Sequence, residues 1–160
     1  MLVREWMTVD PTTVDPRTSI FHAWEIMQEQ RIRHLPVLDE GALVGIVTDR
    51  DLRLTLPSPA ANLGRHEVLS LLRQLQVAEV MTREVICTTP HTAIRAAAQV
   101  LMTNRVGALP VTEGGALVGI LTRTDVLEAF VRSVRAGPAD RPEAEAVCGK
   151  EHLHLRGPTS

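Results

Sequence analysis

The sequence predicts an α/β protein built from two tandem strand–helix–strand–strand–helix repeats, related by pseudo-twofold symmetry and packed through their sheets. Two observations carry this prediction. The hexapeptide GALVGI occurs at 41–46 and again, unchanged, at 115–120. A shift of 74 residues also aligns 7–56 with 81–130 without a gap, and 18 of the 50 aligned pairs are identical. The chain therefore contains a tandem duplication.

A unit of about 50 residues buries too little surface to be comfortably stable alone. We therefore expect the two sheets to pack on each other, to bury one shared core, and to leave two related clefts between the units. The expected division is repeat 1 at 1–56, a linker at 57–76, repeat 2 at 77–135 and a C-terminal tail at 136–160.

The first helix of repeat 1 is expected in the stretch DPRTSIFHAWEIMQEQ. Asp15 is the expected N-cap and Pro16 the first helical residue, because short acidic side chains cap helices and proline is favoured at the first position. Apolar residues then recur at helical spacing and are expected in the core. They are Ile20, Ala23, Trp24 and Met27.

Two short β-branched runs follow, HLPVLD and ALVGIVT, and the EG pair between them is typical of a hairpin turn. Thr48 then opens a second helix. Repeat 2 follows the same order, with a helix from Pro90, strands around 109–112 and 116–121, and a helix from Thr122 to about Arg135. The expected core stripe of repeat 2 is Ile94, Ala97, Ala98 and Leu101.

The linker contains leucines at helical spacing from Arg65 onward and predicts an amphipathic helix. Its apolar stripe consists of Val68, Leu69, Leu72 and Leu75. The tail from Ala136 is rich in Pro, Gly and Ala without sustained periodicity, and we expect it to be extended or loosely packed.

Composition argues against several classes of protein. Seventeen basic and nineteen acidic residues leave a net charge of −2, so no polyanion partner is implied. Two Trp, two Phe and no Tyr offer no stacking platform for nucleic acid. The N-terminus has no apolar signal-peptide region, and no apolar run approaches the length needed to cross a bilayer. We therefore expect a cytoplasmic protein without a nucleic-acid or membrane partner.

No catalytic motif is visible, so we expect no enzyme activity. Cys87 lies beside Ile86 in a predicted strand, which favours packing over a nucleophilic role. A C-x₃-H-x-H pattern in the tail has only three candidate ligands and is unspecific, so no metal site is predicted. Its residues are Cys148, His152 and His154.

These features resemble the CBS domain, whose tandem pairs form the so-called Bateman module. The resemblance covers roughly residues 1–134. It rests on the MT pairs at 7–8 and 81–82, on RHLPVLDEGALVGIVTDRDL and on GALPVTEGGALVGILTRTDV. The linker stretch LRLTLPSPAANLGRHEVLSLLRQLQVAEVMT is also similar to that of stand-alone CBS-pair proteins called acetoin-utilisation accessory proteins. The resemblance implies an adenosine ligand (AMP, ADP, ATP or S-adenosylmethionine) in the clefts and pairing into a flat, disk-like homodimer.

For the first cleft, the resemblance implies that Asp51 accepts hydrogen bonds from the ribose hydroxyls and that Thr48 contacts sugar or phosphate. Arg33 and His34 precede the Leu-Pro pair of repeat 1, where basic residues of this family face the phosphates. The other residues implied for this cleft are Ile46, Thr88, Thr89, Val106, Gly107 and Ala108.

The second cleft is implied to use Thr122 and Asp125, with Arg123 as the nearest cation. Gly107 and Ala108 replace the basic pair of repeat 1, so we expect this cleft to be weaker, to prefer an uncharged adenosine derivative, or to stay empty. Its base pocket is implied to contain Thr12, Thr13, Ile32 and Arg33.

Each of these patterns also has a purely structural explanation. The T-x-x-D pattern at 48–51 and 122–125 is that of a helix capping box, which is compatible with ligand binding because a helix N-terminus favours anions. The pair Arg33-His34 is also consistent with a solvated helix end. Arg50 and Arg53 fit either a charge pair on a helix face or outer phosphate contacts.

The leading hypothesis is a regulatory module that senses an adenine nucleotide and acts through a protein effector. The alternative is a constitutive dimeric scaffold with degenerate ligand sites. Apolar residues of the last helix are expected to form the dimer surface. They are Val126, Leu127, Phe130, Val131 and Val134.

Overall fold

The computed structural model describes residues 1–58 and 62–135. The expected tail, with Cys148, His152 and His154, lies outside the described residues. The elements in chain order are η1 (Val3–Glu5), β1 (Thr8–Val9), α1 (Ile20–Gln30), β2 (His34–Asp39), β3 (Ala42–Thr48), α2 (Asp49–Leu54), α3 (Arg65–Gln74), η3 (Val77–Glu79), α4 (Ile94–Thr103), β4 (Ala108–Glu113), β5 (Ala116–Thr122) and α5 (Arg123–Arg135).

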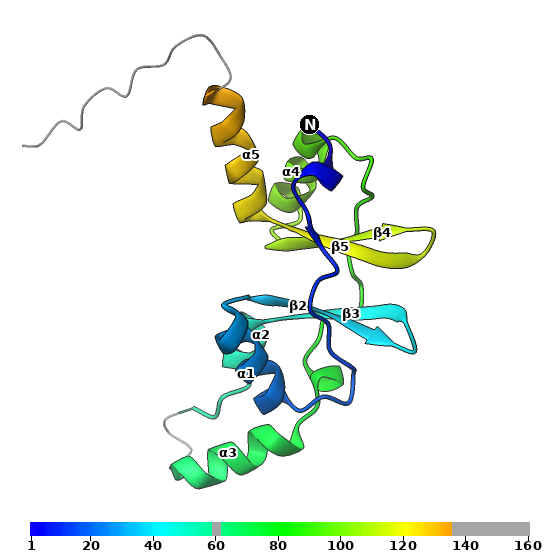
Figure 1. Cartoon of the computed structure of the whole chain (residues 1–160). Helices are drawn as coiled ribbons and strands as arrows, with labels where there is room; N and C mark the ends of the chain where they lie inside the picture. The colour runs from blue at the N-terminus through cyan, green and yellow to red at the C-terminus, as the bar shows by residue number, and fades with distance from the viewer. Residues whose placement is uncertain (59–61, 136–160) are drawn as a thin grey trace, which may run out of the picture.

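The two repeats form two small antiparallel sheets that face each other across the middle of the molecule (Figure 1). The β2–β3 hairpin is one sheet, and β1, β5 and β4, in that order, form the other. Helices α1 and α2 lie on the outer side of the first sheet, and α4 and α5 lie on the outer side of the second (Figure 1). The predicted fold class of two α/β repeats packed through their sheets is confirmed.

The hydrophobic core differs from the expected one, because it consists of two clusters and not of one shared core. Alternate residues of a strand face opposite sides of a sheet, so each hairpin directs its leucines and valines toward its own helices. The residues between them, such as Pro36 and Ile120, face the other sheet and are too few for a core of their own. The first cluster includes Leu35, Val37 and Val47, and the second includes Leu109, Val111 and Leu121.

Most of the predicted helix stripes lie in these clusters. Ile20, Ala23 and Met27 are buried, but Trp24 is 45% exposed. Trp24 lies at the edge of the stripe, where its ring is 6.3 Å from that of Phe21. In α4, Ala98 is likewise only half-buried, whereas its neighbours in the stripe are buried.

The leading segments of the two repeats are exchanged. Strand β1 pairs with β5 of repeat 2, where Thr8 lies opposite Ile120, and Val3 is completely buried in the second core cluster. In repeat 2 the corresponding strand is reduced to a single bridge, in which Thr82 pairs with Ile46 of repeat 1. Each repeat therefore completes the sheet of the other.

The first helix of each repeat begins later than predicted. Helix α1 begins at Ile20, and Ser19 caps it by accepting a hydrogen bond from the backbone N–H of His22 at 3.1 Å. The earlier proline, Pro16, lies in a turn, since the carbonyl of Asp15 accepts a hydrogen bond from the N–H of Thr18. Helix α4 begins at the equivalent position, Ile94, and not at Pro90. The prediction of a strand at Cys87 was also wrong, because this cysteine is exposed in a loop.

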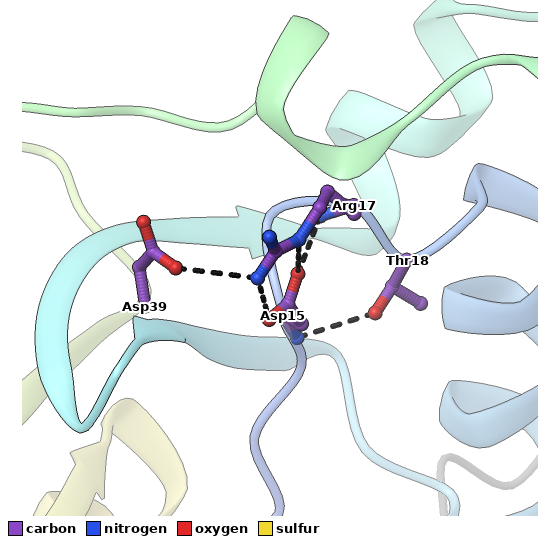
Figure 2. A network of polar contacts seen from close by, with 4 residues as sticks. All are labelled: Asp15, Arg17, Thr18 and Asp39. Carbon is purple, nitrogen blue, oxygen red and sulfur yellow. Dashed lines mark hydrogen bonds and ion pairs between the residues drawn. The ribbon is translucent and has the colours of Figure 1, made fainter.

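The turn before α1 is tied to the β2–β3 hairpin by an arginine between two carboxylates (Figure 2). The guanidinium of Arg17 contacts Asp15 at 2.9 Å and Asp39 at 3.5 Å. Hydrogen bonds from Arg17 lower the pKa of Asp15 to about 2. In repeat 2 the equivalent residues are His91 and Glu113, whose side chains are 3.2 Å apart. In both repeats a side-chain contact therefore joins this turn to the hairpin, through arginine and aspartate in repeat 1 and through histidine and glutamate in repeat 2.

The linker helix α3 is present as predicted and packs against α1 of repeat 1. None of its residues is fully buried. Leu72 and Leu75 contact the first core cluster. The guanidinium of Arg73 lies 5.0 Å from the centre of the Phe21 ring, which adds a cation–π contact.

The repeated hexapeptide is explained by the exchanged segments. A Cβ atom added at Gly45 would lie 2.6 Å from the sulfur of Met81, and one added at Gly119 would lie 2.7 Å from the sulfur of Met7. Backbone oxygens are also close, because a Cβ at Gly119 would lie 2.9 Å from the carbonyl of Thr8 and one at Gly45 would lie 3.1 Å from that of Thr82. The second glycine of each GALVGI is therefore required where the other repeat's leading segment crosses the strand.

We predict that Gly45→Ala and Gly119→Ala each lower the free energy of unfolding by about 1–3 kcal/mol, since overpacking against backbone forces the exchanged segment to move. Urea denaturation followed by circular dichroism measures the change. Gly64→Ser is the control. A Cβ there would make only an ordinary contact with the Glu67 side chain, at 3.5 Å. Serine caps helices well, and the change should stay within about 0.5 kcal/mol. Wild-type stability of both alanine variants would contradict this account.

Candidate functional site

A first cleft lies between the start of α2 and the segments of repeat 2 that face it. It encloses about 320 Å³. One wall is the β3–α2 junction, and the opposite wall comes from the loop after Thr82 and the residues before β4. The lining residues are His34, Ile46, Thr48, Asp49, Arg50, Asp51, Thr82, Glu84, Val85, Ile86, Arg105, Val106, Gly107, Ala108, Pro110 and Arg123.

A second, larger cleft of about 810 Å³ lies between the start of α5 and repeat 1. Its walls come from the β5–α5 junction, from the loop after β1 and from the end of α1. The lining residues are Thr8, Asp10, Pro11, Thr12, Gln30, Arg31, Ile32, Arg33, His34, Asp49, Gly107, Ile120, Thr122, Arg123, Thr124 and Asp125.

The two clefts are built from equivalent positions. Under the 74-residue shift, Thr48 and Asp51 of the first correspond to Thr122 and Asp125 of the second, and Arg105 corresponds to Arg31. The clefts also touch. Four residues line both and form what we call the shared wall: His34, Asp49, Gly107 and Arg123.

The carboxylate at each helix start is held by a capping box that leaves one oxygen available. Asp51 Oδ2 accepts hydrogen bonds from the backbone N–H and the hydroxyl of Thr48, both at 2.8 Å. Asp125 Oδ2 accepts the same pair from Thr122 at 2.6 and 2.8 Å. Within residues 1–58 and 62–135, no hydrogen bond to Oδ1 of either aspartate is found. The capping and ligand-binding explanations are therefore compatible in geometry.

His34 lies against repeat 2 at the shared wall. A Cβ added at Gly107 would lie 2.5 Å from His34 Nε2, so only glycine allows this approach. Burial lowers the pKa of His34, and the positive charges of Arg123 and Arg33 act in the same direction. Asp49 and Asp51 oppose this shift without cancelling it. His34 is therefore neutral at pH 7.

The shared wall also contains two opposite charges that result from divergence of the repeats. Asp49 and Arg123 occupy equivalent positions, each the first residue of its helix. Asp49 Oδ2 accepts a hydrogen bond from Arg53 at 2.7 Å. Arg123 donates its backbone N–H to the carbonyl of Gly107 at 3.1 Å and its Nε to the carbonyl of Val106 at 3.0 Å. The Arg123 side chain is thus tethered between the two clefts.

Most residues expected in the first cleft line it, but three do not. Arg33 lines the second cleft. Thr88 is buried and forms a backbone bridge to Val111 at the edge of β4, and Thr89 hydrogen-bonds Thr92. In the second cleft, Thr13 is absent from the lining. The expected residues that do line a cleft are Thr48, Asp51, His34, Ile46, Val106, Gly107 and Ala108 for the first, and Thr122, Asp125, Arg123, Thr12, Ile32 and Arg33 for the second.

One lining residue that escaped the sequence analysis, Ile86, could have been found from the repeat itself. Thr12 has Ile86 as its equivalent, so the counterpart of the 12–13 segment is 86–87, not 88–89. Glu84 and Val85 are the equivalents of Asp10 and Pro11, which line the second cleft. The 74-residue shift could not have found these four residues, because neither pair was expected from the sequence.

Among the residues that the structure describes, no helix is long and apolar enough to cross a membrane. Over the same ranges, no group of three or more His, Cys, Asp or Glu side chains could hold a metal ion.

The CBS-domain family model matches residues 3–58 and 77–132. A CBS domain-containing protein of Dictyostelium discoideum is 31% identical over 140 residues, covering 86% of this chain and 97% of the relative. The AcuB protein of Vibrio cholerae, a putative acetoin utilization protein, has a crystal structure 28% identical with a TM-score of 0.69, covering 84% of this chain and 93% of that one.

Two further similar structures contain ligands. Arabidopsis CBSX2 in complex with AMP is 32% identical with a TM-score of 0.68, covering 84% of this chain and 98% of that one. The CBS pair of protein MJ0100, in complex with 5′-methylthioadenosine and S-adenosyl-L-methionine, is 27% identical with a TM-score of 0.69. That comparison covers 83% of this chain and 98% of that one.

We predict that His34 makes stability pH-dependent. Because its folded-state pKa lies below the ordinary value of 6.5, the unfolded chain binds a proton that the folded chain does not. Its contribution to the free energy of unfolding is therefore complete above pH 6.5 and is lost as pH falls from there toward the lowered pKa. Urea denaturation from pH 8 to 5 should show a flatter profile for His34→Gln than for the wild type. Identical profiles for His34→Gln and the wild type would refute the assignment.

Proposed function

The chain belongs to the CBS-domain family as a tandem pair, and we propose that it is a regulatory module that binds an adenine nucleotide in the clefts between its repeats. AMP, ADP, ATP and S-adenosylmethionine are the candidate ligands. The proposal is for a binding protein without enzyme activity, whose conformational response is read by a protein effector.

The observation that carries the proposal is the chemistry of the first cleft. Its repeat 2 side carries apolar side chains, including Val85, Ile86 and Val106, which suit the face of a flat ring. Across the cleft, Asp51 presents a carboxylate oxygen that the capping box leaves available. An acceptor at the start of a helix suits a ribose diol, and the helix N-terminus suits a phosphate.

The similar proteins support an adenosine ligand. One was crystallised with AMP, the other with 5′-methylthioadenosine and S-adenosyl-L-methionine. Adenosine is the group these three ligands share, whereas their charges differ. We therefore propose the adenosine group as the common determinant and the clefts' charged residues as the source of selectivity among derivatives.

We propose that a homodimer transmits the effect of ligand binding to the protein effector. In α5, Leu127 and Phe130 are 63% and 64% exposed, and Val131 and Val134 are also exposed. The opposite side of the same helix packs against the second core cluster through Ala129, which is buried. A ligand that bridges both repeats alters their relative angle only if it binds two arrangements with different affinity. Such a change would reach the α5 surface through the β5–α5 junction.

The exposed α5 face also favours an alternative, a constitutive dimeric scaffold with degenerate clefts. The two functions differ in what the clefts do. The regulatory module requires a nucleotide to change stability and shape, and the scaffold requires neither.

We predict that at least one of AMP, ADP, ATP and S-adenosylmethionine raises the thermal unfolding midpoint. A ligand at 100 times its dissociation constant adds about 2.7 kcal/mol. Asp51→Asn should abolish the shift from the first cleft, because the amide oxygen can still accept the capping bonds of Thr48 while the amide group replaces the ribose acceptor with a donor. Asp125→Asn is the matched variant for the second cleft.

Both asparagine variants should unfold close to the wild-type midpoint without ligand, since the caps are retained. If no adenosine compound shifts any of the three proteins, the sensor is excluded and the scaffold remains. A shift that survives in the double variant would place the nucleotide outside these clefts.

We predict that Phe130→Glu converts a dimer into a monomer, since a buried carboxylate opposite an apolar partner surface is costly. Size-exclusion chromatography with light scattering gives the mass. Glu128→Gln, on the neighbouring exposed position of α5, should leave the dimer intact. A monomeric wild type, or a Phe130→Glu protein that stays dimeric, would contradict dimerisation through this face.

A further inference from the structure

The two clefts share a wall, so they also share its charges. Arg123 is the single arginine that lines both clefts. Its Nε is occupied by the carbonyl of Val106 at 3.0 Å, which holds the guanidinium at the boundary. The other charged member of the wall, Asp49, is negative and is bound by Arg53.

The charges that line the clefts cancel. Five arginines line one or both clefts: Arg31, Arg33, Arg50, Arg105 and Arg123. Five carboxylates line them as well: Asp10, Asp49, Asp51, Glu84 and Asp125. Neither cleft has a surplus of cations of its own, because each contains three arginines and three carboxylates when the shared pair is counted in both.

His34 does not add a positive charge at neutral pH. Its imidazole is packed against Gly107, and burial lowers its pKa. The charged groups around it are Asp49, Asp51, Arg33 and Arg123. Arg123 is therefore the one cation of the shared wall when the clefts are empty.

We propose that a phosphate-bearing ligand in one cleft weakens the binding of a second one in the other, so that the other cleft then favours an adenosine compound without negative charge. This inference rests on the proposed function and names the ligand classes for the paired clefts. A phosphate that contacts the shared wall pairs with Arg123, and the net charge around the wall then becomes negative. A second phosphate in the other cleft would be repelled by the first phosphate on the other side of the same guanidinium.

The repulsion is strong enough to measure. Two anions on either side of one guanidinium are about 8 Å apart, within roughly one Debye length at physiological salt, so screening removes only part of their interaction. We expect a second AMP to bind at least about tenfold more weakly than it would to an empty neighbour. Uncharged adenosine experiences no such penalty.

The inference changes what the sequence suggested about selectivity. Arg33 was expected to favour a charged ligand in the first cleft, but it lines the second. Because positive and negative side chains are balanced in both clefts, the residues of neither cleft favour a charged nucleotide over an uncharged ligand. Occupancy of one cleft sets the charge that the other accepts.

The test is isothermal titration calorimetry with AMP and with adenosine at pH 7.5 and low salt. Asp125→Asn leaves only the first cleft competent and Asp51→Asn only the second, so the two variants give the affinity of each cleft with its neighbour empty. In the wild type, we expect the second AMP to bind at least about tenfold more weakly than AMP binds to either single variant. The two adenosine affinities should equal those of the variants.

Asp49→Asn removes one negative charge from the shared wall and should raise the AMP affinity of both clefts. Lowering the pH to 6 should reduce the AMP coupling in the wild type, because a bound phosphate favours protonated His34, and His34→Gln should remove that pH effect. If the wild type binds two AMP molecules with the same affinities as the two variants, and also binds two adenosine molecules, the inference is overturned while the proposed function stands. Failure of both compounds to bind would overturn the proposed function together with it.

Discussion

The close crossing of each leading segment over a glycine of the other repeat is the contact on which the rest of the structure depends. Met7 lies against Gly119 and Met81 against Gly45, at distances that exclude any side chain. These crossings bring Thr8 and Thr82 into the opposite sheets. They hold the two hairpins face to face, and the clefts exist because the loops after each crossing then pass the helix starts of the other repeat.

Duplication gave the clefts the same geometry, and divergence gave them different chemistry. The capping boxes of Thr48–Asp51 and Thr122–Asp125 are nearly superimposable in their hydrogen bonds. The first helical residue, by contrast, is an aspartate in one repeat and an arginine in the other. Because both residues reach the boundary between the clefts, the divergence produces a charge pair where perfect symmetry would have placed two like charges.

The sequence predicted the repeat, both hairpins and the helix starts at Thr48 and Thr122, because these depend on local patterns that occur twice. It misplaced the start of α1, since Pro16 is as favourable in a turn as at a helix start, and only the hydrogen bond that the His22 N–H donates to Ser19 decides between them. The exchange of leading segments left no periodic signal, because it depends on contacts between residues about 110 positions apart, such as Thr8 and Ile120. The cleft residues supplied by loops, such as Glu84, were missed for the same reason.

The exchanged N-terminus has a consequence for synthesis of the protein. Val3 and Thr8 are synthesised well before the cluster that buries Val3 and the strand that pairs with Thr8. The core cluster of repeat 1 is complete only when Val77 and Met81 have been made. The nascent chain therefore carries this unpaired apolar segment until α5 is nearly complete, and the sheet of repeat 2 can be completed only after both repeats have been made.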